Sequence, residues 1–217
     1  MKEIKNLTWT KNQLWEGCIY ASIVHSIMSA HYPYVSHERS WDGINCSLPG
    51  ATITFHPSAC VAAFRTYDSE RINAHIKAED YFQGAPKEII DLAKNEALQY
   101  LLEEVEGEVV PLITTAIWEE DGVFKSLDTQ SSFMEHGGEI IETHLLDINE
   151  AKEIWQEEYE MEEEHCELVL SLFKRKIANP SEKIILTADE IKIIGVDDEF
   201  GIQESKMCCE QIGIFWE

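Results

Sequence analysis

The sequence lacks a long apolar run, and no segment approaches the roughly 20 consecutive apolar residues that a membrane-spanning helix requires. Its N-terminal residues also lack an uninterrupted apolar stretch, so we expect no signal peptide. Six cysteines are present, but apart from the vicinal pair Cys208 and Cys209 they lie far apart, which is a poor disulfide framework. We therefore expect a cytoplasmic protein with reduced cysteines and no membrane contact.

Basic residues are scarce: 17 Lys and Arg stand against 41 Asp and Glu, for a net charge of −24. Residues 1–94 are near neutral, with 9 basic and 10 acidic residues, whereas residues 95–217 hold 8 basic and 31 acidic residues. A field of this sign repels nucleic acid and attracts basic proteins or cations. We expect a basic protein as the partner and no nucleic-acid binding, although net charge alone also serves solubility.

Motifs for cofactors are missing as well. There is no Gly-x-Gly-x-x-Gly and no Gly-x-x-x-x-Gly-Lys-Ser/Thr, so nucleotide binding has no support. Glu162 and His165 form one Glu-x-x-His unit, but di-iron bundles use two such units with two further glutamates. We therefore expect neither a metal nor a cofactor.

The composition that remains is that of an ordinary globular protein, with 44% apolar and 27% charged residues. A chain of 217 residues is long enough to bury a substantial core without disulfide bonds or a structural metal. No repeat, low-complexity tract or Gly/Ser linker marks a boundary. The sequence predicts a single α+β domain over residues 1–217, in which antiparallel sheet elements pack against several helices.

Helical periodicity is clearest in two long segments. Apolar positions recur at helical spacing over residues 10–31, where a helix should end before Tyr32-Pro33. A long acidic helix is predicted over residues 149–178, stopped by Asn179-Pro180. Two shorter helices are predicted over residues 86–104 and around residues 203–211.

Strands are predicted between these helices. A small antiparallel meander should include residues 51–55 and 60–67, and Asp121-Gly122 should supply a tight turn between two later strands. The remaining apolar runs predict strands at residues 109–118, 123–127, 140–146, 183–187 and 190–196.

One group of residues resembles a catalytic motif. Gln13 and Cys18 open an apolar helix, as in cysteine hydrolases, where a glutamine contributes to an oxyanion site and a thiolate acts as nucleophile. His144, or else His136, is the proposed histidine partner. Against this, Cys18 falls in the middle of the predicted helix, where an apolar-face cysteine is normally a core residue. A hydrolase using Cys18 is therefore the alternative function.

Acidic and aromatic residues are interleaved in two places. An acidic rim around aromatic anchors is the arrangement expected for steered, tight binding to a basic protein, although helical spacing also allows Trp155 and Tyr159 to face the core. The predicted partner-binding residues are Trp118, Glu119, Glu120 and Asp121 in the first place, and Glu157, Glu158 and Glu160 beside Trp155 and Tyr159 in the second.

The build of the chain, small, acidic and α+β without a trusted catalytic signature, is similar to that of immunity proteins that neutralise bacterial toxins, often basic nucleases. This resemblance implies a non-enzymatic inhibitor with a basic toxin or nuclease as its partner. It assigns a role to no individual residue.

Overall fold

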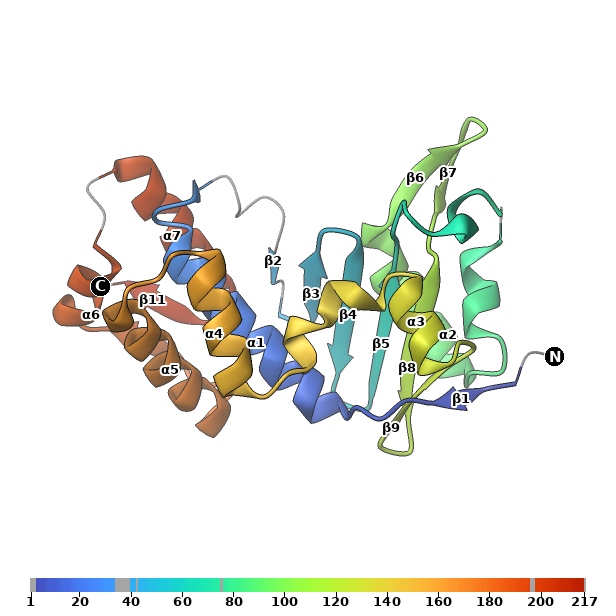
Figure 1. The fold of residues 1–217 in the computed structure, drawn as a ribbon, viewed down its shortest axis with the longest axis horizontal. Helices are drawn as coiled ribbons and strands as arrows, with labels where there is room; N and C mark the ends of the chain where they lie inside the picture. Colours follow the sequence, from blue (N-terminus) through green and yellow to red (C-terminus); the bar gives the residue numbers. More distant parts are fainter. Residues whose placement is uncertain (1–2, 34–39, 42, 75, 196–197, 217) are drawn as a thin grey trace. The chain divides into compact units, whose positions relative to one another are not determined.

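Figure 1 presents a computed structural model that describes residues 3–33, 40–41, 43–74, 76–195 and 198–216. The chain divides into two compact units, one formed by Met1–Gln13 with Ile44–Glu142 and the other by Leu14–Gly43 with Thr143–Glu217. Helices and an antiparallel sheet are both present, which confirms the predicted α+β class. The single domain expected from the sequence stays a prediction.

The first unit contains a six-stranded antiparallel sheet in the order β1-β9-β8-β5-β4-β3. The meander predicted around residues 51–67 is confirmed as β3, β4 and β5. The predicted turn between β8 and β9 is also confirmed, since Asp121 and Gly122 have φ angles of 56° and 79°. The strands are β1 (Lys5–Asn6), β3 (Asn45–Leu48), β4 (Ala51–His56), β5 (Ala59–Phe64), β8 (Thr115–Glu120) and β9 (Val123–Ser126).

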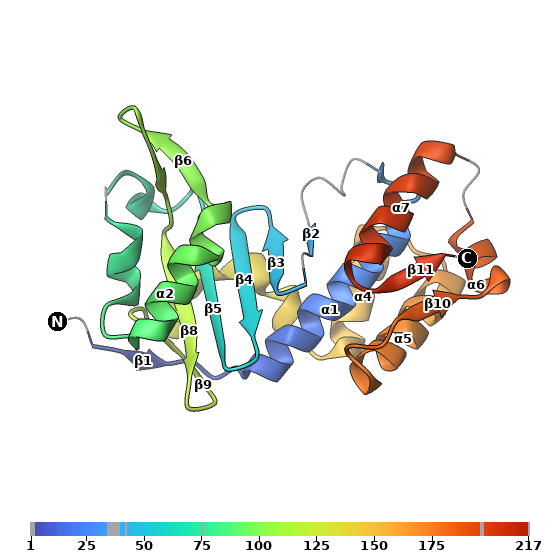
Figure 2. The same cartoon turned by 180° about the vertical axis from the view of Figure 1, so that it is seen from behind.

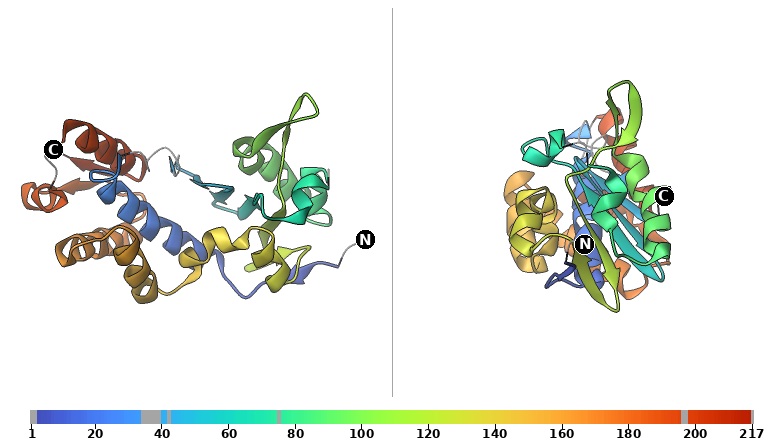
Figure 3. Two further views of the ribbon diagram at one scale, coloured as in Figure 1. Left: turned by 45° about the horizontal axis from the view of Figure 1, so that its top comes forward. Right: turned by 90° about the vertical axis from the view of Figure 1, so that its right-hand side faces the viewer.

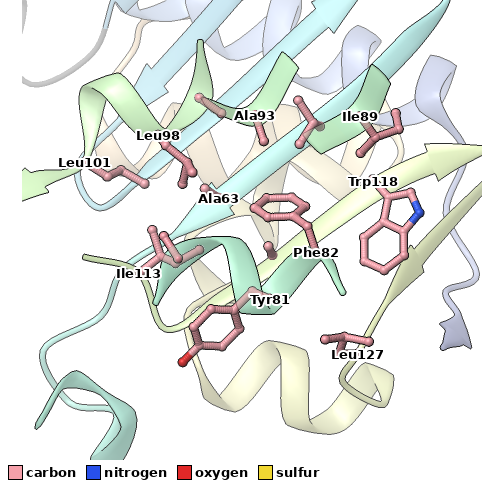
Figure 4. Close-up of a cluster of buried hydrophobic side chains, with 14 of the residues drawn as sticks. Ala63, Tyr81, Phe82, Ile89, Ala93, Leu98, Leu101, Ile113, Trp118 and Leu127 are labelled. Carbon is pink, nitrogen blue, oxygen red and sulfur yellow. The ribbon is translucent and has the colours of Figure 1, made fainter. Parts of the chain in front are cut away.

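Both faces of this sheet are covered, so β5 is buried along its whole length. Val61 and Ala63 point to the face that packs on α2 and the 3-10 helices η3 and η4, the core drawn in Figure 4. Phe64 points to the other face, where its ring centroid lies 5.0 Å from that of Phe133 on α3. The helices are α2 (Lys87–Asn95), α3 (Gln130–Glu135), η2 (Glu70–Asn73), η3 (Ala78–Phe82), η4 (Ala97–Tyr100) and η5 (Gly138–Ile141).

A separate two-stranded ribbon is formed by β6 (Leu102–Val105) and β7 (Glu108–Pro111). The helix predicted over residues 86–104 therefore ends too late, because α2 stops at Asn95 and the chain becomes extended at Leu102. The single strand predicted over residues 109–118 is two strands, β7 and β8. The ribbon's turn explains this result: Glu106 and Gly107 have φ angles of 53° and 86°, which is the geometry of a two-residue hairpin.

The second unit is mainly helical. The predicted long N-terminal helix is confirmed as α1 (Lys11–Met28), and most of its residues are buried, as expected for a helix enclosed by others. Tyr20 packs edge-on against Phe173 of α5, and the Ser205 hydroxyl of α7 donates to the Ser26 carbonyl at 2.7 Å. The other elements are α4 (Ile148–Glu158), α5 (Glu163–Ala178), α6 (Ala188–Ile194), α7 (Glu199–Gln211), η6 (Thr143–Leu145), the short strand β2 (Ser40–Trp41), and the parallel pair β10 (Ile184–Leu186) and β11 (Ile214–Trp216).

Three predictions for the second half of the chain are wrong in detail. The helix predicted over 149–178 is two helices, because Glu160 adopts a left-handed conformation with φ 49° between α4 and α5. In place of the strand predicted over 190–196, the structure has α6, which begins with a capping box between Thr187 and Glu190 and ends before Gly195, with φ 66°; residue 196 lies outside the described residues. The strand predicted over 140–146 is the pair of 3-10 turns η5 and η6.

Candidate functional site

Cys18, the candidate nucleophile, lies in the middle of α1 and its side chain has no exposed surface. A catalytic thiolate needs access to its substrate, and it gains from the positive end of a helix rather than from its middle. The placement of Cys18 is that of a core residue.

The two residues proposed to act with Cys18 in catalysis, His144 and Gln13, lie in different elements. His144 is buried in η6, where its ring packs edge-on against Trp155 at 5.9 Å. Its carbonyl oxygen lies 1.9 Å from where a Cβ on Gly17 would stand, so the main chain at His144 presses directly on α1. Gln13 lies more than one turn before Cys18 in the same helix and is half-buried.

The burial of the cysteines gives a direct test of the hydrolase alternative. All six are reduced and buried, and burial raises the pKa of Cys60, Cys166, Cys208 and Cys209. We expect the native protein to react with a thiol reagent such as dithiobis-nitrobenzoate far more slowly than a free thiol at neutral pH. All six thiols should react once the chain is unfolded in guanidinium.

The control for this labelling is a Cys18→Ala variant, mapped by peptide mass spectrometry beside the wild type. Rapid labelling of one native thiol that disappears in Cys18→Ala would contradict the buried placement. That result would favour the hydrolase alternative over binding.

A serine, a histidine and an aspartate meet in the first unit, but not as a catalytic triad. His136 Nδ1 lies 2.8 Å from the Ser69 hydroxyl, and that hydroxyl also caps η2 by accepting from the Arg71 amide. Asp128 instead forms a two-pronged ion pair with Arg71, at 2.7 and 2.8 Å, and accepts from the Thr115 hydroxyl at 2.7 Å. Asp128 thus orients an arginine rather than the histidine, and the network ties η2, β8 and α3 together.

The Glu-x-x-His unit does not form part of a larger group of ligands. Glu162 is exposed before α5, whereas the His165 ring packs against the His31 ring at 5.4 Å between centroids. Burial, followed by the nearby His31, lowers the pKa of His165. Within the described ranges, no group of three or more His, Cys, Asp or Glu side chains is placed to hold a metal ion.

Trp118, the predicted anchor for a partner, is fully buried, and this corrects its assignment to a binding surface. Its ring packs 6.3 Å from Phe82 in the cluster of Figure 4, and its indole N–H donates to Glu120 at 3.4 Å. The Trp118 side chain points to the face of the sheet that α2, η3 and η4 cover. It therefore belongs to the core, although an acidic turn follows it in the sequence. Truncating Trp118 would remove about 3–5 kcal/mol of core packing rather than a binding contact.

Trp155 and Tyr159 are buried too, in agreement with their helical spacing. Their rings stack at 6.1 Å, and the Tyr159 hydroxyl lies 2.9 Å from Nδ1 of His25 on α1. These aromatic residues hold α4 against α1, and their acidic neighbours and Ile154 are exposed.

The acidic residues predicted to bind a partner lie at the surface to different extents. Asp121 is exposed at the tip of the β8–β9 turn, whereas Glu119 accepts from the Gly122 amide and Glu120 pairs with Lys125 at 3.0 Å. On α4 and just after it, Glu157, Glu158 and Glu160 are exposed.

The acidic surface of the second unit extends beyond those three residues. Nine glutamates between residues 150 and 167 are exposed, against Lys152 as the one Lys or Arg in that stretch. Lys152 pairs with Glu163 at 3.0 Å, which joins α4 to α5. The exposed glutamates, which we call the α4–α5 acidic surface, are Glu150, Glu153, Glu157, Glu158, Glu160, Glu162, Glu163, Glu164 and Glu167.

Sequence reasoning missed a second exposed region, around the β6–β7 ribbon. Tyr67 and Val109 are 66% and 68% exposed, and Leu102 is 41% exposed. Tyr67 donates its hydroxyl to Glu103 of β6 at 2.9 Å. The signal available in the sequence is Glu106-Gly107, a turn dipeptide between the helix predicted over residues 86–104 and the strand predicted over residues 109–118.

Cations gather at one place in the second unit, beside the C-terminal end of α5. A hollow of about 360 Å³ is lined there by Lys174, Arg175 and Lys183, with Glu182 among them. Arg175 pairs with Glu190 at 2.7 Å, and Lys183 lies over the Phe215 ring at 5.1 Å. Cations at the last turn of a helix complement its dipole, which accounts for Lys174 and Arg175, and Lys183 has the Phe215 ring as its partner.

Searches with protein-family models, against curated proteins and against solved structures give no match to this chain. Among the helices that the structure describes, none has the length and apolar composition needed to cross a bilayer. The function is therefore inferred from the exposed surfaces of the chain.

Proposed function

We propose that this chain is a non-enzymatic binding protein for a basic protein partner, most concretely an immunity or inhibitor protein that neutralises a basic toxin or nuclease. One observation carries the proposal: the α4–α5 acidic surface holds nine exposed glutamates and a single lysine. A basic surface approaching these carboxylates gains Coulomb energy from all of them, which steers association and raises its rate.

The placement of the other candidate residues supports binding over catalysis. Cys18 is enclosed in α1, and Asp128, the aspartate of the Ser69–His136 network, is paired with Arg71. At the α4–α5 acidic surface, carboxylates lie along two consecutive helices whose aromatic residues face inward. Such a surface offers charge for recognition and lacks a nucleophile.

The proposal predicts an association rate that depends on salt. Exposed charges are screened beyond about 10 Å at 0.1 M salt, so raising the salt from about 0.05 M to about 0.5 M should slow association on the order of tenfold. Dissociation should change much less. Surface plasmon resonance of the full chain against the protein products of the genes that flank its own measures both rates, with lysozyme and cytochrome c as non-cognate basic proteins.

A charge-reversed variant localises the effect. Glu157→Lys with Glu158→Lys should lower the association rate and flatten its salt dependence, whereas the control Glu88→Lys with Asp91→Lys, on exposed positions of α2, should do neither. Binding of the flanking protein no tighter than that of lysozyme would overturn the proposal. If neither salt nor charge reversal on α4 changes the association rate, the acidity serves solubility alone.

A further inference from the structure

The β6–β7 ribbon has features that its own packing does not explain. Among the strands that the structure describes, β6 and β7 pair only with each other. In Figures 1, 2 and 3 the ribbon extends beyond the main sheet of its unit. An isolated two-stranded hairpin is marginally stable in water, so a second surface lying on it would add to its stability.

One face of the ribbon carries three apolar side chains beside one glutamate, and two of the apolar side chains are exposed. The register places Leu102 opposite Pro111 and Glu104 opposite Val109, so these four side chains share a face. Val109 is 68% exposed and Leu102 41%. Apolar side chains grouped at the surface of a soluble protein mark interaction sites more often than scattered ones do.

The same ribbon is strongly acidic. Glu103, Glu104, Glu106 and Glu108 fall within ten residues that contain no Lys or Arg. The last three are exposed, and they lie beside and beyond Val109 toward the turn. The exposed Leu102 and Val109 thus have carboxylates around them, Glu104 on the same face and the others near the turn, which is the pattern of a binding hot spot with charged surroundings.

The base of the ribbon is held in place by contacts within its unit. Arg65 pairs with Glu103 at 3.2 Å and donates to the Leu102 carbonyl at 3.4 Å. Its guanidinium lies over the Tyr67 ring at 5.4 Å, and Tyr67 donates to Glu103. A ribbon fixed at its base presents its outer face with little loss of conformational freedom on binding.

Protection against aggregation explains only part of this pattern. Charged residues on exposed strands prevent edge-to-edge pairing, and the glutamates would serve that purpose. Leu102 and Val109 would not, because a polar β-forming residue such as threonine suits an exposed strand without adding apolar surface. The two apolar side chains require a separate reason.

We infer that the β6–β7 ribbon is a docking element for the basic partner, with Leu102 and Val109 packing against an apolar patch that lysines and arginines surround. The inference rests on the proposed function and adds the contact that slows dissociation. A second copy of this chain does not fit as the occupant, since four glutamates on each ribbon would face four on the other.

The test is a ribbon variant, Leu102→Thr with Val109→Thr, measured by surface plasmon resonance against the flanking-gene product that the wild type binds. We expect dissociation about tenfold faster, with the association rate changed less than about twofold. The matched control is Ile185→Thr, an apolar strand residue on β10 that is 39% exposed. It should leave both rates unchanged.

The outcomes separate the inference from the proposed function. Salt-dependent binding with unchanged dissociation of the ribbon variant would overturn the inference and leave the function standing, whereas absence of binding by the wild type would overturn both. Circular dichroism and thermal melting must show the variant folded; if they do not, Val109→Thr alone, at the more exposed position, replaces it. A concentration-dependent dimer that the ribbon variant abolishes would identify a second copy as the occupant and also overturn the inference.

Discussion

Asp128→Ala should reduce the free energy of unfolding by about 3–5 kcal/mol, because it leaves the half-buried Arg71 guanidinium without its counter-ion. Asp128 is 6% exposed and receives two hydrogen bonds from Arg71 and one from Thr115. Its removal would also loosen the connection between η2 and β8. Urea unfolding followed by circular dichroism measures the loss.

The matched control is Glu79→Ala, which removes the carboxylate of an ion pair whose two side chains are each 47% exposed. Exposed pairs contribute about 1 kcal/mol or less, so this variant should remain close to the wild type. Similar losses for Asp128→Ala and Glu79→Ala would contradict the structural role assigned to the buried network.

The same ion pair gives a pH dependence with a definite sign. Burial would raise the pKa of Asp128, but hydrogen bonds from Arg71 and Thr115 and the charge of Arg71 outweigh it, and the folded pKa is lowered. A lowered folded pKa adds stability at pH values above the unfolded pKa of about 4, and this stability is lost as the pH falls through the folded pKa. As the pH is lowered from about 4 through the folded pKa of Asp128, the free energy of unfolding of Asp128→Ala should therefore fall less than that of the wild type.

Local patterns with a strong physical cause could be predicted from the sequence. Asp121-Gly122 specifies a two-residue hairpin because both positions require positive φ, and the structure has it. The α1 helix follows from apolar residues at helical spacing ahead of Tyr32-Pro33. The meander around β4 follows from short strands separated by turn residues.

The errors arise where pairing or capping overrides composition. Glutamate-rich residues near 102–108 are typical of a helix, yet they pair as a ribbon because Glu106-Gly107 turns the chain. The apolar run at 190–194 is typical of a strand, yet the Thr187–Glu190 capping box starts a helix there. Each deciding signal was a short dipeptide or a three-residue spacing within a longer pattern.

The candidate site shows the same limit. Interleaving of acidic and aromatic residues located the acidic surface on α4, but it could not tell which aromatic rings face solvent. Trp118 is buried because its strand is covered by η3, whose Phe82 ring packs against it, a tertiary contact that no local pattern reports. Tyr67 is 66% exposed, and its hydroxyl donates a hydrogen bond to Glu103, which is 36 residues away in the sequence. Exposure depends on which segments meet, so it had to come from the structure.

Gly17→Ala should also be strongly destabilising, although alanine favours a helix by about 1 kcal/mol over glycine. A Cβ at residue 17 would lie 1.9 Å from the carbonyl oxygen of His144, and main chain cannot swing aside as a flexible side chain can. Moving the η6 turn away from α1 should cost on the order of 3 kcal/mol or more, so the net loss should be about 2 kcal/mol. Thermal or urea unfolding of the variant measures it.

The control is Asn12→Ala, an exposed position in the first turn of the same helix, which should change stability by no more than about 0.5 kcal/mol. The result bears on function as well as on packing. A stabilised Gly17→Ala variant would mean that His144 stands away from α1, leaving room beside Cys18 for the access that a nucleophile needs. A destabilised one, with thiol reactivity still low, keeps α1 as a core helix and removes the hydrolase alternative.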